Sequence, residues 1–345
     1  MPINYEPIDT TTDVATTRTL LHEVIPLTGT IVSGTYGTFP NDDNIKNYSH
    51  GMFQSVYDYP YLSSSANHIF DLTAGFDESS PLSGSVSSVQ ETKKINMYNQ
   101  FSQVLLGYTG STNRVRLFES DLTLDEDSPM KETIFVNLSR LLTKDEIKKG
   151  SVSITLGTAS WANPFSGVKT FTDADAAENA GTLNTIGGDY GILSSSTGVG
   201  GVIFYQAGVM VLTSSIWAGT TDFFSQSGTA RTFDNQLVSG SISGSADAFR
   251  HRLYNLQFNN TTEINSTVYF CRMPHNKFNY SSNPTYLNAG SIRVKNNSRN
   301  NPPISYITTV GLYNSQNELL AVAKLSEPLR KDPTNELTLR VRLDY

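Results

Sequence analysis

The last part of the chain has the clearest alternation of apolar and polar positions. Residues 304–313 are rich in β-branched and aromatic side chains, 314–317 form a polar turn, and 319–325 are a second apolar run. Two such runs around a short polar turn predict a β-hairpin. After two prolines, residues 337–343 alternate apolar with polar and predict a third strand. An ordered strand at the end of a chain indicates that it closes a sheet.

Shorter strands are predicted along the rest of the chain, where β-branched and apolar runs occur at 134–138, 152–156, 201–212 with Gly208 as a bulge, 253–258 and 268–273. The last two are expected to be separate strands joined through 259–262. Two long polar stretches, 161–184 and 218–247, are predicted to be loops. Between residues 20 and 61 aromatic side chains are dense, as expected of core or interface anchors: Tyr48, Phe53, Tyr57, Tyr59 and Tyr61.

Two helices are predicted from capping boxes. Ser88 with Glu91 three residues later indicates the start of a long helix that ends at Gly107 or Gly110. Its apolar face is expected to contain Met97, Phe101, Val104, Leu105 and Tyr108. We expect this helix to pack on a sheet; the alternative is docking on a partner protein. A second, shorter helix is predicted from Thr143 to Gly150.

These elements predict a mainly β fold, with an antiparallel β-sandwich core, one packed amphipathic helix and long loops. Residues 1–19 mix Pro, Thr and Asp with few large apolar groups. They are expected to form an extended N-terminal arm that is either flexible or laid on a neighbouring subunit. Residues 20–345 are expected to form a β-rich structural domain, whose subdivision the sequence leaves open.

Charged residues make up 17% of the chain, below the roughly one quarter of ordinary globular proteins. A surface of this kind packs against neighbouring proteins with little desolvation of charge. The net charge is −7, and the richest basic cluster is interrupted by acidic residues: Arg330, Lys331, Arg340 and Arg342. Binding to nucleic acid needs several cations that face phosphates, so it is not expected.

The single cysteine, Cys271, excludes an intrachain disulfide and a multi-cysteine metal site. It lies in a strand-like run, and we expect a buried, inert thiol. The first residues have neither a cationic region nor an apolar core, so no signal peptide is predicted and synthesis without secretion is expected. The most apolar stretch, 199–212, is too short and too polar to span a membrane.

No motif for catalysis, a cofactor or a metal stands out, and we expect no catalytic, cofactor-binding or metal-ligating residue. Five scattered histidines lack the spacing of a zinc site: His22, His50, His68, His251 and His275. Two acidic clusters have alternating carboxylates, as calcium loops do: Asp121, Asp125, Glu126 and Asp127, and then Asp173, Asp175 and Glu178. Neither cluster has the glycine and final glutamate of an EF-hand, so solvated loops are expected. A carboxylate pair for glycoside hydrolysis stays open, because sequence does not give its separation.

Three stretches carry a resemblance to a known family. They are Gly311-Leu312-Tyr313 followed by 318–325 and Pro328, the segment 137–150, and the segment 278–286. Together they resemble structural proteins in the virions of contractile-tailed marine bacteriophages, cyanophages among them, from about Asn67 onward. The resemblance implies a virion protein of the tail or baseplate type, and it transfers no catalytic residue.

The leading hypothesis is therefore a non-enzymatic structural part of a tailed phage particle, in the tail or baseplate. Its expected partners are other virion proteins and further copies of itself, with no nucleic acid, membrane or cofactor. One alternative is a head decoration, neck or fibre-attachment protein. Another is a carbohydrate-binding receptor protein, which stacks Trp161, Trp217 and exposed tyrosines on sugars, although core packing is the expected use of the tryptophans.

Overall fold

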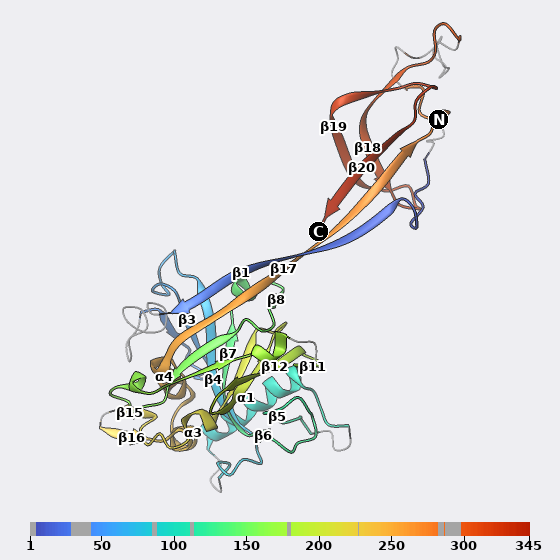
Figure 1. Cartoon of the computed structure of the whole chain (residues 1–345). Helices are drawn as coiled ribbons and strands as arrows, with labels where there is room; N and C mark the ends of the chain where they lie inside the picture. Colours follow the sequence, from blue (N-terminus) through green and yellow to red (C-terminus); the bar gives the residue numbers. More distant parts are fainter. Residues whose placement is uncertain are drawn as a thin grey trace. The chain divides into compact units, whose positions relative to one another are not determined.

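A computed structural model describes residues 5–28, 43–84, 88–110, 114–177, 181–226, 228–281, 286 and 298–345. The chain forms two compact units. Unit 1 consists of Met1–Leu20 and Glu263–Tyr345, and unit 2 consists of Leu21–Thr262. The chain passes between the units twice, each time within a long strand, β1 (Val14–Thr28) and β17 (Leu253–Met273), and these two strands pair with each other (Figure 1).

Unit 2 is built on antiparallel strands of one large sheet, in the order β17-β9-β10-β12-β13-β14-β7-β4-β3-β2. These strands are β2 (Ile45–Asn47), β3 (Gln54–Tyr57), β4 (His68–Phe76), β7 (Glu132–Leu138), β9 (Ser153–Gly157), β10 (Val168–Thr172), β12 (Gly188–Ser195), β13 (Gly198–Phe204) and β14 (Val209–Thr213). β8 (Glu146–Ile147) pairs with β17 and β11 (Thr182–Thr185) with β12. Two small hairpins are separate from this sheet: β5 (Phe118–Glu119) with β6 (Pro129–Met130), and β15 (Phe224–Gln226) with β16 (Thr229–Arg231).

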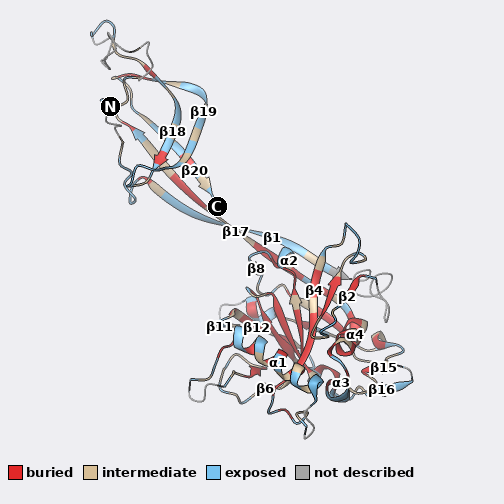
Figure 2. Cartoon of the chain, turned by 180° about the vertical axis from the view of Figure 1, so that it is seen from behind, coloured by how far each residue is buried: buried red, intermediate tan, exposed pale blue. Residues whose placement is uncertain are grey.

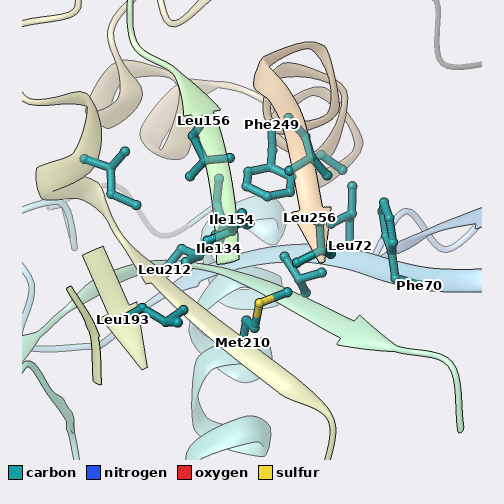
Figure 3. Packing of buried hydrophobic residues seen from close by; sticks show 14 of the residues in the cluster. Phe70, Leu72, Ile134, Ile154, Leu156, Leu193, Met210, Leu212, Phe249 and Leu256 are labelled. Atoms are coloured by element: carbon teal, nitrogen blue, oxygen red, sulfur yellow. The ribbon is translucent and has the colours of Figure 1, made fainter. Parts of the chain in front are cut away.

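The core of unit 2 lies on both faces of this sheet. Along β14, Met210 and Leu212 belong to one apolar cluster and Val211 to another, because successive side chains of a strand point to opposite faces. The first cluster also contains Ile154 and Leu156 of β9. Strands β9 and β14 are not neighbours in the sheet, yet their side chains pack in the same cluster (Figure 3). The predicted mainly β fold with an antiparallel, sandwich-like core is confirmed.

Helix α1 (Val89–Leu105) starts and ends where the sequence predicts. The Ser88 hydroxyl accepts a hydrogen bond from the Glu91 N–H at 3.1 Å, and the Glu91 carboxylate accepts one from the Ser88 N–H. This is the predicted capping box. At the other end Gly107 has a φ of +84° and donates its N–H to the Ser102 carbonyl, which stops the helix.

The buried face of α1 differs from the predicted one. Val104 is 67% exposed, whereas the helix buries Lys94, Met97, Tyr98, Ser102 and Leu105. The helix lies very close to β4, where a Cβ on Gly75 would be 2.6 Å from the Lys94 carbonyl oxygen. The polar groups on this face have partners of their own; the Tyr98 hydroxyl, for example, donates to the Met130 carbonyl at 2.9 Å. Burial therefore follows hydrogen bonding and close approach as well as hydrophobicity.

The prediction of a second helix from Thr143 to Gly150 is wrong. Helix α2 (Arg140–Thr143) ends at Thr143, and Lys144 follows with a φ of +56°. The next residues form β8, in which Ile147 is completely buried and pairs with Asn260 of β17. Strand pairing and the burial of Ile147 outweigh the local capping signal.

Two predicted strands have different limits in the structure. The single strand predicted at 201–212 is the hairpin of β13 and β14, and Gly208, with a φ of +70°, lies in its turn. The opposite holds for 253–258 and 268–273, which are parts of the continuous strand β17. The polar residues between them stay in the strand because they have partners; the Asn260 amide donates to the Leu142 carbonyl at 2.9 Å.

The two predicted loops contain regular structure. The first includes η1 (Pro164–Ser166), β10, η2 (Ala174–Ala177) and β11. The second includes β15, β16, helix α3 (Phe233–Ser239) and the start of helix α4 (Ile242–Arg252), and it follows η3 (Ser214–Trp217). Thr232 and Ser241 cap the two helices with their side-chain oxygens, a signal that the polar composition obscures. No helix among the described residues is long and apolar enough to cross a membrane.

Unit 1 contains the predicted C-terminal strands, drawn in orange and red in Figure 1. β18 (Ser305–Tyr313) and β19 (Leu319–Lys331) form the predicted hairpin. β20 (Leu337–Asp344) pairs with the end of β17, from Met273 opposite Leu337 to Ser266 opposite Asp344. The predicted hairpin and terminal strand are therefore confirmed, and the terminal strand joins the sheet through its pairing with β17.

The described part of the predicted N-terminal arm, residues 5–19, is built into unit 1. The Phe270 N–H donates to the Asp13 carbonyl at 2.8 Å, and Arg272 pairs with the Asp13 carboxylate at 2.6 Å. Residues from Val14 onward belong to β1. The chain itself holds this segment through these contacts.

A buried cation connects α1 to α3. Lys94 is completely buried, and its ammonium group donates to the carbonyl oxygens of Leu237 and of Gly240, the latter at 2.8 Å. These carbonyls end α3, where a positive charge is favourable. Burial nevertheless lowers the pKa of Lys94 to about 8, from an ordinary value of 10.5.

Replacing this lysine should change how stability depends on pH. Between pH 8 and 10.5 the unfolded chain holds the Lys94 proton and the folded chain does not, so the free energy of unfolding should rise with pH, by up to about 3 kcal/mol. We expect urea unfolding of Lys94→Met to lack this rise. Lys148→Met, at an exposed position, should retain it. Equal slopes in the two variants would show that the pKa of Lys94 is the same in the folded and the unfolded chain.

Candidate functional site

The β18–β19 hairpin is shaped by its turn. The Asn314 side-chain oxygen accepts hydrogen bonds from the N–H groups of Gln316 and Glu318, both at 2.9 Å. Asn317 takes a φ of +68°, a conformation that asparagine tolerates better than most residues. Local side-chain chemistry therefore fixes the end of the hairpin and brings Tyr313 opposite Leu319.

Strand β19 carries apolar side chains on both faces. Leu312 of β18 is buried, and Ala321 of β19 lies opposite it and is half-buried. On the other side, four large apolar side chains near the turn remain in solvent: Tyr313 is 44% exposed, Leu319 52%, Leu320 68% and Val322 52%. We call these four residues the hairpin face. A strand that is apolar on both sides is typical of a strand covered on both sides.

A glycine shapes the hairpin face. Gly311 lies opposite Val322, and a Cβ at this position would be 2.9 Å from the Tyr313 ring and 3.2 Å from the Leu319 side chain. Tyr313 and Leu319 therefore occupy the space above the glycine, as large neighbours commonly do in sheets. The Tyr5 ring lies 5.0 Å from the Tyr313 ring and extends the apolar surface.

Unit 1 has a thin core. Among its described residues, only four apolar side chains are buried: Val268, Met273, Leu312 and Val341. Nine large ones are exposed: Ile8, Leu20, Tyr280, Tyr306, Tyr313, Leu319, Leu320, Val322 and Tyr345. The buried residues that form the two apolar clusters all belong to unit 2. Figure 2 shows the contrast, with buried residues concentrated in the strands of unit 2.

The first predicted acidic cluster is a loop with a partly buried carboxylate. Oxygens of Glu119, Asp121 and Asp127 lie within 4.8 Å of one another. The Thr123 N–H donates to Asp121 at 2.9 Å, and the Thr123 hydroxyl lies 2.7 Å from Asp121 and 3.0 Å from Asp125 and shares its hydrogen between them. Hydrogen bonding to Thr123 lowers the pKa of both carboxyls. Burial raises the pKa of Glu119, which sequence reasoning missed because it lies outside the loop. The loop is therefore organised by Thr123, whose bonds reach two of its carboxylates.

The second predicted acidic cluster does not assemble among the described residues. Asp173 is buried and accepts hydrogen bonds from the N–H groups of Gly150 and Val152 and from the Tyr205 hydroxyl, at 2.7 to 2.9 Å. Burial raises its pKa in spite of these bonds. Asp175 is exposed, and Glu178 lies outside the described residues. Asp173 therefore has a structural role, because its hydrogen bonds connect residues 150–152 to Tyr205.

A second buried charge is also structural. Arg252 is completely buried and donates to the carbonyl oxygens of Gly157, Ala159, Asp222 and Phe223, at 2.7 to 3.3 Å. Burial lowers its pKa to about 10. Its donors are occupied by backbone groups that would otherwise be unsatisfied, so this arginine organises loops and does not present charge to a ligand.

One group of residues resembles a hydrolytic triad in composition but not in geometry. Ser55 donates to an oxygen of Asp71 at 2.5 Å, and a His68 ring nitrogen lies 2.8 Å from the same oxygen. Burial opposes ionisation of Asp71, but the bonds from His68 and Ser55 outweigh it and lower its pKa. In a catalytic triad the serine hydroxyl donates its hydrogen bond to the histidine, whereas the Ser55 hydroxyl donates to the carboxylate of Asp71. The arrangement stabilises β3 and β4.

The other histidines and the cysteine have separate surroundings. His22 contacts Thr261, His251 contacts the Trp161 carbonyl, and His275 pairs with Glu336. In the parts of the chain that the structure describes, the one group of metal-ligating side chains contains no histidine. Cys271 is half-buried, less than expected, and burial raises the pKa of its thiol.

The aromatic residues singled out in the sequence serve mainly as packing. Trp217 is 2% exposed and stacks on Phe233, with ring centroids 5.3 Å apart. Trp161 is half-buried, with its ring 4.2 Å from His251. Tyr48 packs on Phe53, whereas Tyr59 and Tyr61 remain exposed. Trp217 is therefore not available to stack on a sugar.

Comparison with known proteins identifies no relative: no protein-family model, no curated protein and no solved structure matches the chain. The hairpin face is the cluster of large, exposed apolar side chains described above for unit 1.

The thin core of unit 1 should appear in hydrogen exchange. Amides of β18 and β19 should exchange through a local opening of lower free energy than those of β7 and β14, because few apolar contacts hold them. Exchange followed by mass spectrometry on dilute protein measures this difference. Equal protection in the two regions would contradict the view that unit 1 is only weakly held by its own core.

Proposed function

We propose that this protein is a non-enzymatic structural component of a tailed bacteriophage particle, in its tail or baseplate, and that it works by protein–protein assembly. The observation that carries the proposal is the hairpin face, an apolar surface on a unit with few buried apolar side chains. The resemblance to phage virion proteins includes this hairpin, in Gly311-Leu312-Tyr313 and residues 318–325.

The chemistry of the hairpin face suits assembly. Tyrosine is among the residues that most often dominate the binding free energy of an interface, and burial of the leucine and valine side chains adds favourable apolar area. The low proportion of charge, 17% of the chain, reduces the desolvation that a partner must offset. The expected partners are other virion proteins and further copies of this chain, and the expected place is the virion.

Substitutions on the hairpin face should prevent incorporation into particles. Leu320→Ser with Val322→Ser changes two exposed residues, so the stability of the isolated chain should change by no more than about 1 kcal/mol. We expect the variant to stay folded by circular dichroism and to be absent from purified particles. Val104→Ser, which alters an equally exposed apolar residue of α1, should be incorporated normally. Normal incorporation of the hairpin variant would refute the assembly role of this face.

The place in the particle is tested by mass spectrometry of purified heads and tails. We expect the chain in the tail fraction at fixed stoichiometry. Its presence in the head fraction would favour decoration or the neck, and its absence from both would reject a virion role. Binding of the purified protein to a glycan array would instead support a carbohydrate-binding receptor protein.

A further inference from the structure

A pocket of about 290 Å³ lies in unit 2, where β15, β16, α3 and α4 come together (Figure 2). We call it the α3–α4 pocket. Polar side chains dominate its lining, which includes Phe224, Gln226, Arg231, Gln236, Ser243 and Asp247. Its volume is near the lower end of the range of ligand pockets, so it has room for a single ring-sized ligand.

The acidic group of the α3–α4 pocket is held in place by buried donors. The Asp247 carboxylate accepts hydrogen bonds from the Gln54 amide at 2.7 Å and from the Arg250 guanidinium at 3.2 Å. Gln54 is completely buried and Arg250 is 1% exposed, whereas the Asp247 side chain is 21% exposed. The carboxylate therefore has a set orientation while part of it stays accessible, as a binding group requires.

The basic group of the pocket is also held in place. The Arg231 guanidinium donates to the side-chain oxygen of Gln236 at 3.3 Å, and Gln236 itself is 1% exposed. Two glycines make room for Gln236, because a Cβ on Gly240 would be 2.2 Å from its amide nitrogen and a Cβ on Gly244 2.8 Å. Arg231 carries five N–H donors, and most of them have no partner among the described residues.

Two further side chains of the lining have no hydrogen-bond partner in the described part of the chain. Gln226 is exposed and Ser243 is half-buried, and an amide or a hydroxyl can both donate and accept. Phe224 adds an aromatic side chain, whose ring packs edge-on against Trp161 with centroids 5.3 Å apart. The pocket thus offers donors, acceptors and an apolar contact within a small space.

The charges of the pocket select the class of ligand. Arg231 and Asp247 have opposite signs, so a phosphate would meet the carboxylate and a free cation would meet the guanidinium. A neutral molecule with several hydroxyl groups avoids both conflicts, because each hydroxyl can donate to a carboxylate and accept from a guanidinium or an amide. A sugar ring also has apolar C–H groups, which suit a contact with Phe224.

We infer that the α3–α4 pocket binds one neutral sugar ring, either free or as a unit of a glycan. Asp247 accepts hydrogen bonds from its hydroxyl groups, and Arg231, Gln226 and Ser243 supply the others. The inference goes beyond the proposed function, because the pocket belongs to unit 2 and the hairpin face to unit 1.

The test uses the full-length purified protein on an array of neutral and acidic glycans, together with NMR titration of free neutral monosaccharides. Neutral glycans should bind, and a free monosaccharide should bind with a dissociation constant on the order of 1 mM, since so small a ligand makes few contacts. Arg231→Met and Gln226→Ala should each weaken binding about fivefold or more, because each removes hydrogen bonds to the sugar. Gln103→Ala, which truncates an equally exposed glutamine of α1, should leave binding unchanged.

Absence of binding to neutral sugars in both assays would overturn the inference. Binding of equal strength in the wild type and in both pocket variants would also overturn it, because the sugar would then bind elsewhere. Binding restricted to acidic glycans would reject the neutral ligand. Array binding without binding of a free monosaccharide would support the inference and identify the ligand as a unit of a longer glycan.

The inference and the proposed function fail separately. Loss of the Leu320→Ser, Val322→Ser variant from particles does not depend on sugar binding, and Gln226→Ala should still be incorporated. Sugar binding by a chain that is also found in the tail fraction would assign both roles to one protein.

Discussion

Strand β19 carries apolar side chains on both faces, a pattern typical of strands whose two faces are both covered. Unit 2 satisfies this condition by itself: apolar clusters lie on both sides of its sheet, with α1 on one of them. Unit 1 satisfies it on one side only, where Leu312 and Val341 are buried. The protein thus combines a unit with apolar clusters on both faces of its sheet and a unit that leaves one apolar face exposed.

The ionisable groups with the most altered surroundings are bound by the protein's own backbone. Asp173 accepts two N–H groups, Lys94 donates to the end of α3, and Arg252 donates to four carbonyls. Altered pKa values often mark reactive centres, but structural networks alter them too. Here each group has its partners already in place. The altered pKa values of these interior groups are therefore explained by structural hydrogen bonds. The candidate functional surface is the hairpin face of unit 1.

Sequence predicted elements well where local chemistry agreed with packing. The capping box at Ser88 and the hairpin at β18 and β19 are formed by neighbouring residues and were found. The box at Thr143 failed because Ile147 pairs with a strand more than a hundred residues away. The strands of the hairpin face could be predicted, but its exposure could not, since an apolar run on both faces is equally typical of a buried strand.

The Lys94 contact makes the short helix α3 dependent on α1. Helix α3 has 7 residues, far fewer than a helix needs to persist by itself. Two carbonyls at its end find their donor in Lys94, which belongs to α1 and reaches that position only after α1 lies on β4. α3 is therefore an element whose stability depends on the surface that α1 and the sheet provide.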